Sequence, residues 1–182
     1  MPFVKPALTL FILVFMSTSI IGILYNITRE PIAAQQAIRE TYIINELLPG
    51  TYRIERKQIY GNPFVTEVVS GFTNDGELLG YGVVSAAPGY TEAVEIMTGF
   101  DINGMITGVR VLRQRETPGL GTAILNPSFL EQFIGRTETM AVVRMATEDN
   151  EIQALSSATI STNAVVTAIN AALDFKQNIN GR

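Results

Sequence analysis

Residues 155–163, with the sequence Leu-Ser-Ser-Ala-Thr-Ile-Ser-Thr-Asn, concentrate side chains that could hold an anion. Five of these nine residues are Ser or Thr, and an apolar stretch follows that predicts a helix over residues 161–176. The start of a helix presents unpaired N–H groups and the positive end of the helix dipole, so phosphate binds well there. A simple helix cap is the alternative interpretation, but capping uses only one or two hydroxyl groups.

A second segment, residues 114–121, could bring its backbone against a flat ligand. Its sequence is Gln-Arg-Glu-Thr-Pro-Gly-Leu-Gly. Pro118 restricts one backbone dihedral angle, whereas Gly119 and Gly121 permit positive φ angles and close approach. The side chains available to a ligand would come from Glu116, Thr117 and Leu120. A tight turn between a strand and a helix is the alternative interpretation of this segment.

The composition limits the chemistry that the chain can perform. It contains neither cysteine nor histidine, which excludes disulfides and cysteine-ligated metal clusters and removes the usual haem ligand and general base. Redox chemistry would therefore require an organic cofactor. The 13 basic residues are outnumbered by 17 acidic ones and form no cluster, so we expect no binding to nucleic acid.

An apolar segment near the start of the chain predicts a membrane anchor. Residues 7–27 are 21 residues without a charge, enough for a helix to span a hydrocarbon core of roughly 30 Å. A cleaved signal peptide is the alternative, but its apolar region is only about 7–15 residues and ends at a small-residue cleavage site. Lys5 precedes the segment and Arg29 is followed at once by Glu30, which favours a cytoplasmic N-terminus and an external domain.

Residues 30–48 predict a stalk, either as a second helix with Pro31 in its first turn or as a continuation of the anchor. Pro49 and Gly50 end it. The expected organisation is an anchor over 1–28, a stalk over 29–50 and one domain over 51–182.

The sequence of residues 51–182 predicts an α+β fold with an antiparallel sheet and flanking helices. Short turns separate strand patterns, which implies antiparallel pairing. The expected strands cover 64–69, 78–86, 93–100, 106–112 and 140–145. A short helix over 128–134 would have Asn126 as its N-cap and Pro127 at its first position.

Several motifs together resemble the G subunit of the Rnf electron-transport complex and, more distantly, the C subunit of the sodium-pumping NADH:quinone reductase. The most specific are the hexapeptide over 116–121 and the tetrapeptide over 156–159, which match the family's Glu-Thr-Pro-Gly-Leu-Gly loop and its Ser/Thr-Gly-Ala-Thr flavinylation site. Weaker similarity covers nearly all of the chain, at residues 28–33, 47–50, 89–90, 99–101 and 106–111.

The resemblance implies an FMN-binding domain in which a flavin transferase joins the FMN phosphate to Thr159. The hydroxyl of Thr159 would become part of a phosphoester and would not turn over as a nucleophile. The hexapeptide would face the flavin, and Ser161 and Thr162 would hold phosphate or ribityl oxygens. The implied cofactor site comprises Glu116, Thr117, Leu120, Gly121, Ser156, Ser157, Ala158, Thr159, Ser161 and Thr162.

Three positions differ from the family pattern. Ser157 replaces the second, glycine position of the tetrapeptide, Gln153 replaces an aspartate of the transferase motif, and Gln114 replaces a frequent histidine. The change to Ser157 narrows the allowed backbone conformations, and the missing carboxylate at Gln153 removes a group that could assist metal-dependent transfer.

The implied function is electron transfer within a larger complex, without catalysis by the chain alone. That complex would couple electron flow between ferredoxin and NAD to transport of Na⁺ or H⁺ across a bacterial inner membrane. The span contains no charged residue, so the ion path would lie in partner membrane subunits. Two alternatives remain at this level: a flavin-free structural subunit, and a membrane-tethered module that binds a different phosphate ligand.

Overall fold

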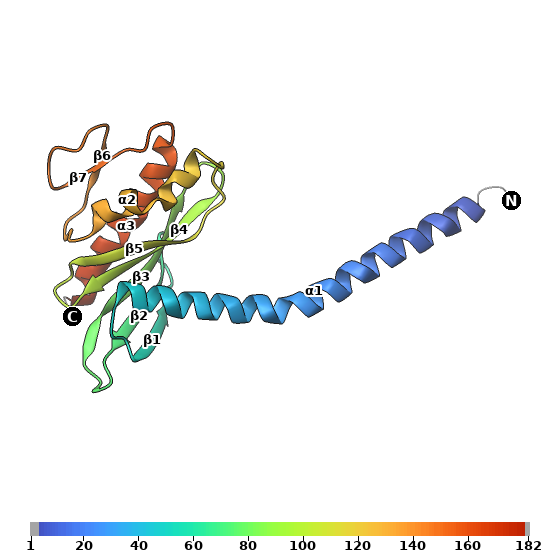
Figure 1. The fold of residues 1–182 in the computed structure, drawn as a ribbon, viewed down its shortest axis with the longest axis horizontal. Helices are drawn as coiled ribbons and strands as arrows, with labels where there is room; N and C mark the ends of the chain where they lie inside the picture. The colour runs from blue at the N-terminus through green and yellow to red at the C-terminus, as the bar shows by residue number, and fades with distance from the viewer. Residues whose placement is uncertain (1–3, 181–182) are drawn as a thin grey trace. The chain divides into compact units, whose positions relative to one another are not determined.

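The computed structural model describes residues 4–180 (Figure 1). The chain divides into two units between Tyr42 and Ile43. The first unit belongs to one helix, α1 (Val4–Leu47), which continues through the position of Pro31. Residues 30–47 therefore continue the apolar helix, which is the second of the two predicted alternatives, and Pro31 does not lie in a first turn. Within α1, Pro6–Ile23 is long and apolar enough to cross a membrane, with a mean hydropathy of 2.1.

The second unit contains a five-stranded antiparallel sheet in which each strand pairs with the next along the chain. The strands are β1 (Arg53–Gln58), β2 (Val65–Phe72), β3 (Leu78–Pro88), β4 (Ala93–Asp101) and β5 (Ile106–Arg113). The sequence predicted the last four but missed β1. Its residues, Arg-Ile-Glu-Arg-Lys-Gln, lack apolar alternation because β1 is an exposed edge strand, where charged side chains oppose pairing with other molecules.

Short elements and one long helix follow the sheet, which confirms the predicted α+β class. They are η1 (Gly121–Leu125), α2 (Pro127–Leu130), η2 (Glu131–Phe133), β6 (Ala141–Val143), β7 (Glu151–Gln153) and α3 (Thr159–Asn180). Pro127 begins α2 as expected, but within the described part of the chain the Asn126 side chain makes no capping hydrogen bond. The final helix begins at Thr159, two residues earlier than predicted.

Helix α3 covers one face of the sheet and forms the main core with it (Figure 1). Val165, Ile169 and Leu173 follow each other at four-residue spacing and are fully buried, against Val83 and Phe100 among others. Full burial of each such side chain stabilises the fold by about 1.5–3 kcal/mol. This packing determines where the first turn of α3 lies relative to the sheet.

A buried lysine fixes the other end of α3. Lys176 Nζ donates a hydrogen bond of 2.7 Å to the Gly104 carbonyl oxygen and lies 5.6 Å from the centroid of the Phe100 ring. Burial lowers the pKa of Lys176, and the nearby Asp101 carboxylate opposes this shift. The contact connects α3 to the turn between β4 and β5, so both ends of the helix are held on the domain.

The opposite face of the sheet receives the end of α1 in a glycine groove, formed by one glycine on each of four adjacent strands. These glycines are Gly71, Gly80, Gly99 and Gly108. A Cβ atom on Gly99 would lie 2.9 Å from Leu47 Cβ, and one on Gly108 would lie 2.8 Å from Leu47 Cδ2. Glycine is therefore required for the helix end to approach this closely.

Polar contacts hold the helix end in the glycine groove. Thr107 Oγ1 donates to the Leu47 carbonyl oxygen at 2.6 Å, and Arg110 forms an ion pair with Glu46. Hydrogen bonding from the Arg110 guanidinium lowers the pKa of the Glu46 carboxyl. The last turn of α1 thus belongs to the folded domain.

Candidate functional site

An open cavity of about 500 Å³ lies where the loop after β5 meets the start of α3. It brings together the two segments that the sequence analysis selected separately. The lining residues are Tyr90, Glu116, Thr117, Leu120, Gly121, Ser157, Ala158, Thr159, Ile160 and Ser161. Eight of the ten predicted site residues are in this lining, whereas Ser156 and Thr162 lie outside it.

The loop over residues 114–121 is shaped by its own backbone. Gly119 has a φ of +80°, and its N–H donates to Thr122 Oγ1 at 3.0 Å. Gly121 lies so close to the helix start that a Cβ atom there would be 2.7 Å from Glu116 Cβ and 2.9 Å from Ser161 Oγ. Gly119 therefore allows the loop to turn, and Gly121 allows it to pack against α3.

The Glu116 carboxylate joins three segments that are distant in sequence. Its Oε1 accepts hydrogen bonds from the backbone N–H groups of Tyr90 at 2.9 Å and Thr91 at 3.3 Å. Its Oε2 accepts the hydroxyl of Ser161, which lies 45 residues further along the chain. Glu116 is only 5% exposed, and buried carboxylates require such partners. It therefore fixes the relative positions of the β3–β4 turn, the loop and α3.

The hydroxyl groups of Ser161 and Thr162 are used inside the protein. Ser161 donates to Glu116, while Thr162 Oγ1 donates to the Ala158 carbonyl oxygen at 2.9 Å and accepts the Leu155 N–H at 3.2 Å. Thr162 is fully buried. Both residues thus shape the turn into α3. Ser161 also lines the cavity, whereas Thr162 lies outside the lining.

Thr159 is the first residue of α3, and its side chain is exposed in the cavity lining. The preceding turn is closed by a hydrogen bond from the Ala158 N–H to the Leu155 carbonyl oxygen at 3.1 Å. The N–H groups in the first turn of a helix have no partner within the helix. Thr159 therefore presents its hydroxyl where an anion would be stabilised.

Ser157 has a φ of +65° and is the one non-glycine residue with a positive φ in the described part of the chain. This left-handed conformation explains why glycine suits the position in the related tetrapeptide. The residue is exposed, so the backbone can adopt the conformation without a steric conflict with the core.

We predict that Ser157→Gly will raise the free energy of unfolding by about 1 kcal/mol, because glycine adopts positive φ without a Cβ penalty. Urea unfolding of the full-length chain in detergent, followed by circular dichroism, measures this change. Ser156→Gly is the matched control: Ser156 is also exposed but lacks a positive φ, so this substitution should be destabilising. Equal losses of stability in both variants would contradict the explanation.

The other two departures from the family pattern have structural partners. Gln114 Oε1 accepts the Glu116 N–H at 2.6 Å, so its side chain supports the loop. The backbone N–H of Gln153 donates to Gln132 Oε1 at 2.8 Å, and the Gln153 side chain is exposed at the end of β7. Gln153 lies outside the cavity lining.

Sequence reasoning missed two residues of the cavity lining, Tyr90 and Ile160. Tyr90 lies in the turn between β3 and β4, and its place beside Gly89 was the available signal. A Cβ atom on Gly89 would be 2.5 Å from Glu116 Oε1, so the glycine permits the approach of the buried carboxylate.

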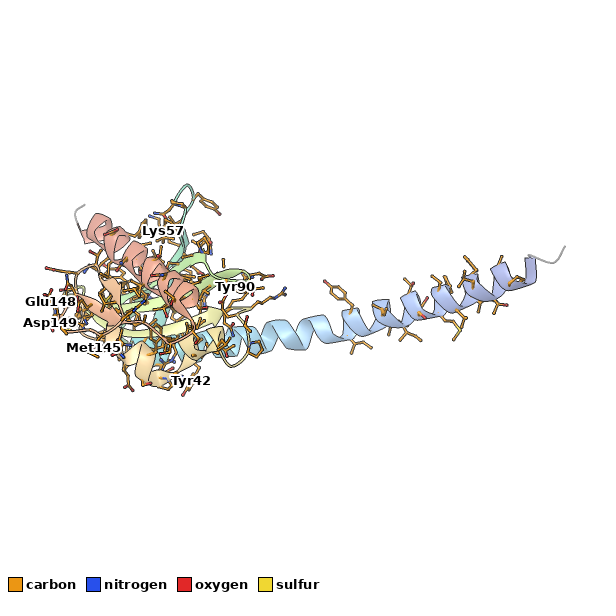
Figure 2. All side chains as sticks on the ribbon, turned by 90° about the horizontal axis from the view of Figure 1, so that it is seen from above. Tyr42, Lys57, Tyr90, Met145, Glu148 and Asp149 are labelled. Carbon is orange, nitrogen blue, oxygen red and sulfur yellow. The ribbon has the colours of Figure 1, made fainter. Side chains whose placement is uncertain are left out.

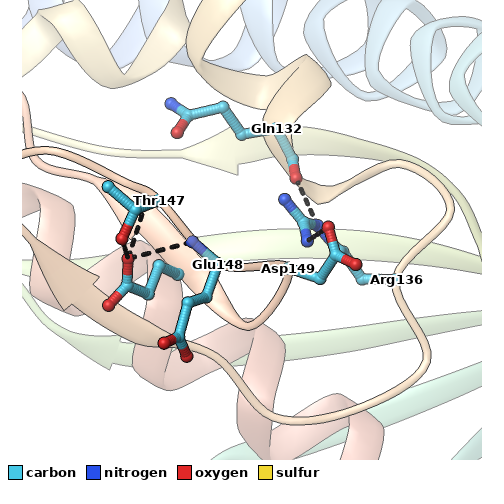
Figure 3. Close-up of polar contacts among 6 residues, drawn as sticks. Gln132, Arg136, Thr147, Glu148 and Asp149 are labelled. Atoms are coloured by element: carbon cyan, nitrogen blue, oxygen red, sulfur yellow. Dashed lines mark hydrogen bonds and ion pairs between the residues drawn. The ribbon is translucent and has the colours of Figure 1, made fainter.

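A second cavity, of about 470 Å³, lies beside the loop between β6 and β7. There Arg136 Nε donates to the Gln132 carbonyl oxygen at 3.0 Å and Arg136 lies 3.8 Å from Asp149 (Figure 3). The Glu151 carboxylate accepts the Thr147 N–H at 2.8 Å, which lowers the pKa of Glu151. These local contacts hold Arg136 and Glu151 in place, so we assign both side chains a structural role.

Comparison with known proteins agrees with the geometry. Residues 89–174, which contain both segments, match the FMN-binding domain family. The chain is 37% identical over 118 residues to the G subunit of the Na⁺-translocating ferredoxin:NAD⁺ oxidoreductase complex of Acetobacterium woodii, covering 62% of this chain and 56% of that protein. It is 28% identical over 177 residues to the G subunit of the ion-translocating oxidoreductase complex of Methanosarcina acetivorans, covering 94% and 93% of the two chains.

Two solved structures share the fold. One is NqrC of Shewanella oneidensis, with a TM-score of 0.52 and 22% identity over 59% of this chain and 54% of the other. The second is the C subunit of the Na⁺-translocating NADH-quinone reductase of Parabacteroides distasonis, with a TM-score of 0.52 and 18% identity over 69% and 77% of the chains.

The match over residues 89–174 indicates the class of protein: this segment is similar to the FMN-binding domain family. Over 94% of its length the chain is similar, at 28% identity, to G subunits of ion-translocating oxidoreductase complexes, which agrees with the resemblance seen in the motifs.

Proposed function

We propose that this chain is an electron-transfer subunit of a membrane ion-translocating oxidoreductase complex of the ferredoxin:NAD type, and that it carries electrons on FMN attached to Thr159 through a phosphoester. One observation carries the proposal. The hydroxyl of Thr159, at the first position of α3, is exposed in a cavity that is also lined by the family hexapeptide.

The residues of the cavity suit FMN. A volume of about 500 Å³ lies within the range of about 300–1,000 Å³ that is typical of ligand pockets. Tyr90, Leu120 and Ile160 offer apolar surface for a flavin ring, and the start of α3 offers N–H groups for phosphate. Bound FMN would supply reversible one- and two-electron chemistry, which a chain without cysteine-ligated clusters would take from an organic cofactor.

The chain itself would bind, orient and tether the cofactor. In the transfer, the bond from Thr159 Oγ to phosphorus would form as the bond from phosphorus to the leaving group of the flavin-nucleotide donor breaks, and the hydroxyl proton would leave with that group. Relative to free FMN the product lacks one water, so the protein gains the mass of FMN less one water. A covalent tether makes rebinding intramolecular and keeps the local concentration of cofactor high. The Glu116 carboxylate holds the loop and the start of α3 together, and thereby maintains the shape of the cavity.

The remaining parts of the proposal concern the membrane. Residues 1–28 would anchor the chain by a single span in the bacterial inner membrane, 29–50 would form the stalk, and 51–182 the FMN-binding domain. Lys5 before the span favours a cytoplasmic N-terminus, with the domain on the periplasmic side. Partners would be the other membrane subunits, which contain the path for Na⁺ or H⁺, and the flavin transferase that matures the chain.

The intact mass of the chain, purified from its native membrane, tests the cofactor and its bond together. We expect a mass equal to the polypeptide plus FMN less one water, with the added mass on the peptide that contains Thr159. An unmodified mass with no flavin absorption would favour a flavin-free structural subunit. An unmodified mass together with binding of a phosphorylated metabolite would favour a module for another phosphate ligand.

A further inference from the structure

Tyr90 combines a fixed backbone with an exposed side chain in the wall of the cavity. Its N–H donates to the buried Glu116 carboxylate at 2.9 Å, and the turn that contains it is closed by a hydrogen bond of 3.0 Å from the Gly89 N–H to the Glu92 carbonyl oxygen. The side chain is nevertheless 68% exposed (Figure 2). An exposed aromatic residue is common, but this one is held in place by a buried charged group.

The other exposed tyrosines of the domain differ from Tyr90, because they do not line the cavity. Tyr52 and Tyr60 are 75% and 89% exposed, and neither is in the lining of the cavity beside α3. At Tyr90, the apolar side chains of Leu120 and Ile160 are also about half exposed in the same lining. The three side chains together expose an apolar surface to solvent. A flat ring bound in the cavity would cover this surface.

We propose that Tyr90 stacks on the isoalloxazine ring of the flavin and forms the aromatic wall of its pocket. This inference rests on the proposed function and assigns to the β3–β4 turn a role that neither sequence motif includes. Aromatic rings prefer offset-stacked or edge-to-face contacts with centroids about 4.5–7 Å apart. The backbone fixed by Glu116 reduces the loss of conformational freedom when such a contact forms.

Stacking has a spectroscopic consequence that a purely structural role lacks. A phenol in contact with an excited flavin donates an electron to it, and the electron returns to the phenol without emission. The flavin in the native protein should therefore fluoresce weakly, and emission should rise when denaturation separates it from Tyr90. The ratio of native to denatured fluorescence reports this contact independently of the amount of flavin.

The test compares this ratio in full-length wild-type protein, Tyr90→Leu, Tyr90→Phe and Tyr60→Leu, with FMN content determined by intact mass. We expect the ratio to rise several-fold in Tyr90→Leu and also in Tyr90→Phe, which keeps a ring that is harder to oxidise. Tyr60→Leu should leave the ratio unchanged, because Tyr60 is 89% exposed in the connection between β1 and β2.

The outcomes separate the two proposals. If both Tyr90 variants carry FMN and keep the wild-type ratio, the stacking role is wrong and the electron-carrier function stands. If the wild-type chain carries no FMN by mass, both proposals fail. Tyr90→Phe removes only a hydroxyl group, so it decides the question even where Tyr90→Leu disturbs folding.

Discussion

Thr159→Ala is expected to produce a folded chain that carries no covalent flavin. The substitution removes the hydroxyl that would form the phosphoester, and Thr159 is exposed, so the free energy of unfolding should change by no more than about 0.5 kcal/mol. In cells that express the flavin transferase, the intact mass should equal that of the polypeptide alone. The fluorescent band of the denatured chain in a gel should disappear.

Thr167→Ala is the matched control for this prediction. Thr167 is also an exposed threonine of α3, but it lies about two turns further along the helix. Its substitution should leave both the added mass and the fluorescent band at the wild-type level. A fluorescent band that survives in Thr159→Ala, with the added mass on another residue, would show that Thr159 is not the attachment site.

Gly80→Ala is expected to destabilise the domain by about 3 kcal/mol or more, at the upper end of the range for overpacking. A Cβ atom at this position would collide with the backbone carbonyl oxygen of Phe100 and would lie 2.9 Å from Leu48 Cδ2. The carbonyl belongs to the neighbouring strand, so it cannot move away without breaking the sheet. The thermal midpoint of unfolding should fall by about 6–12 °C or more for a chain of this size.

Gly82→Ala provides the comparison, because Gly82 lies two residues further along β3 on the same face. Its nearest neighbour would be Met97 Sδ at 3.5 Å, an ordinary van der Waals contact. We expect a loss of less than about 1 kcal/mol from this substitution. Equal thermal midpoints for the two variants would contradict the close approach of Gly80 to the Phe100 carbonyl oxygen and to Leu48.

Local sequence patterns were sufficient for much of this protein. Alternation and turn residues located β2 to β5, and the four-residue spacing of Val165, Ile169 and Leu173 located α3. The two motifs identified the loop and the threonine that meet in one cavity. These features can be predicted from the sequence because the period of a helix or strand, and the residue types of a turn, depend on residues close together in the chain.

Other features depend on contacts between distant segments, and no local pattern encodes them. The charged strand β1 becomes a strand only by pairing with β2, and the end of α1 joins the domain only because four strands supply glycines beneath it. Long-range contacts also direct the Glu116 carboxylate to the Ser161 hydroxyl and to the backbone of Tyr90 at the cavity. The order of residues along the chain was therefore enough to locate β2 to β5, α3 and the threonine that lines the cavity. Burial and long-range hydrogen bonding determine which side chains remain available to a ligand. Both arise only in the folded chain.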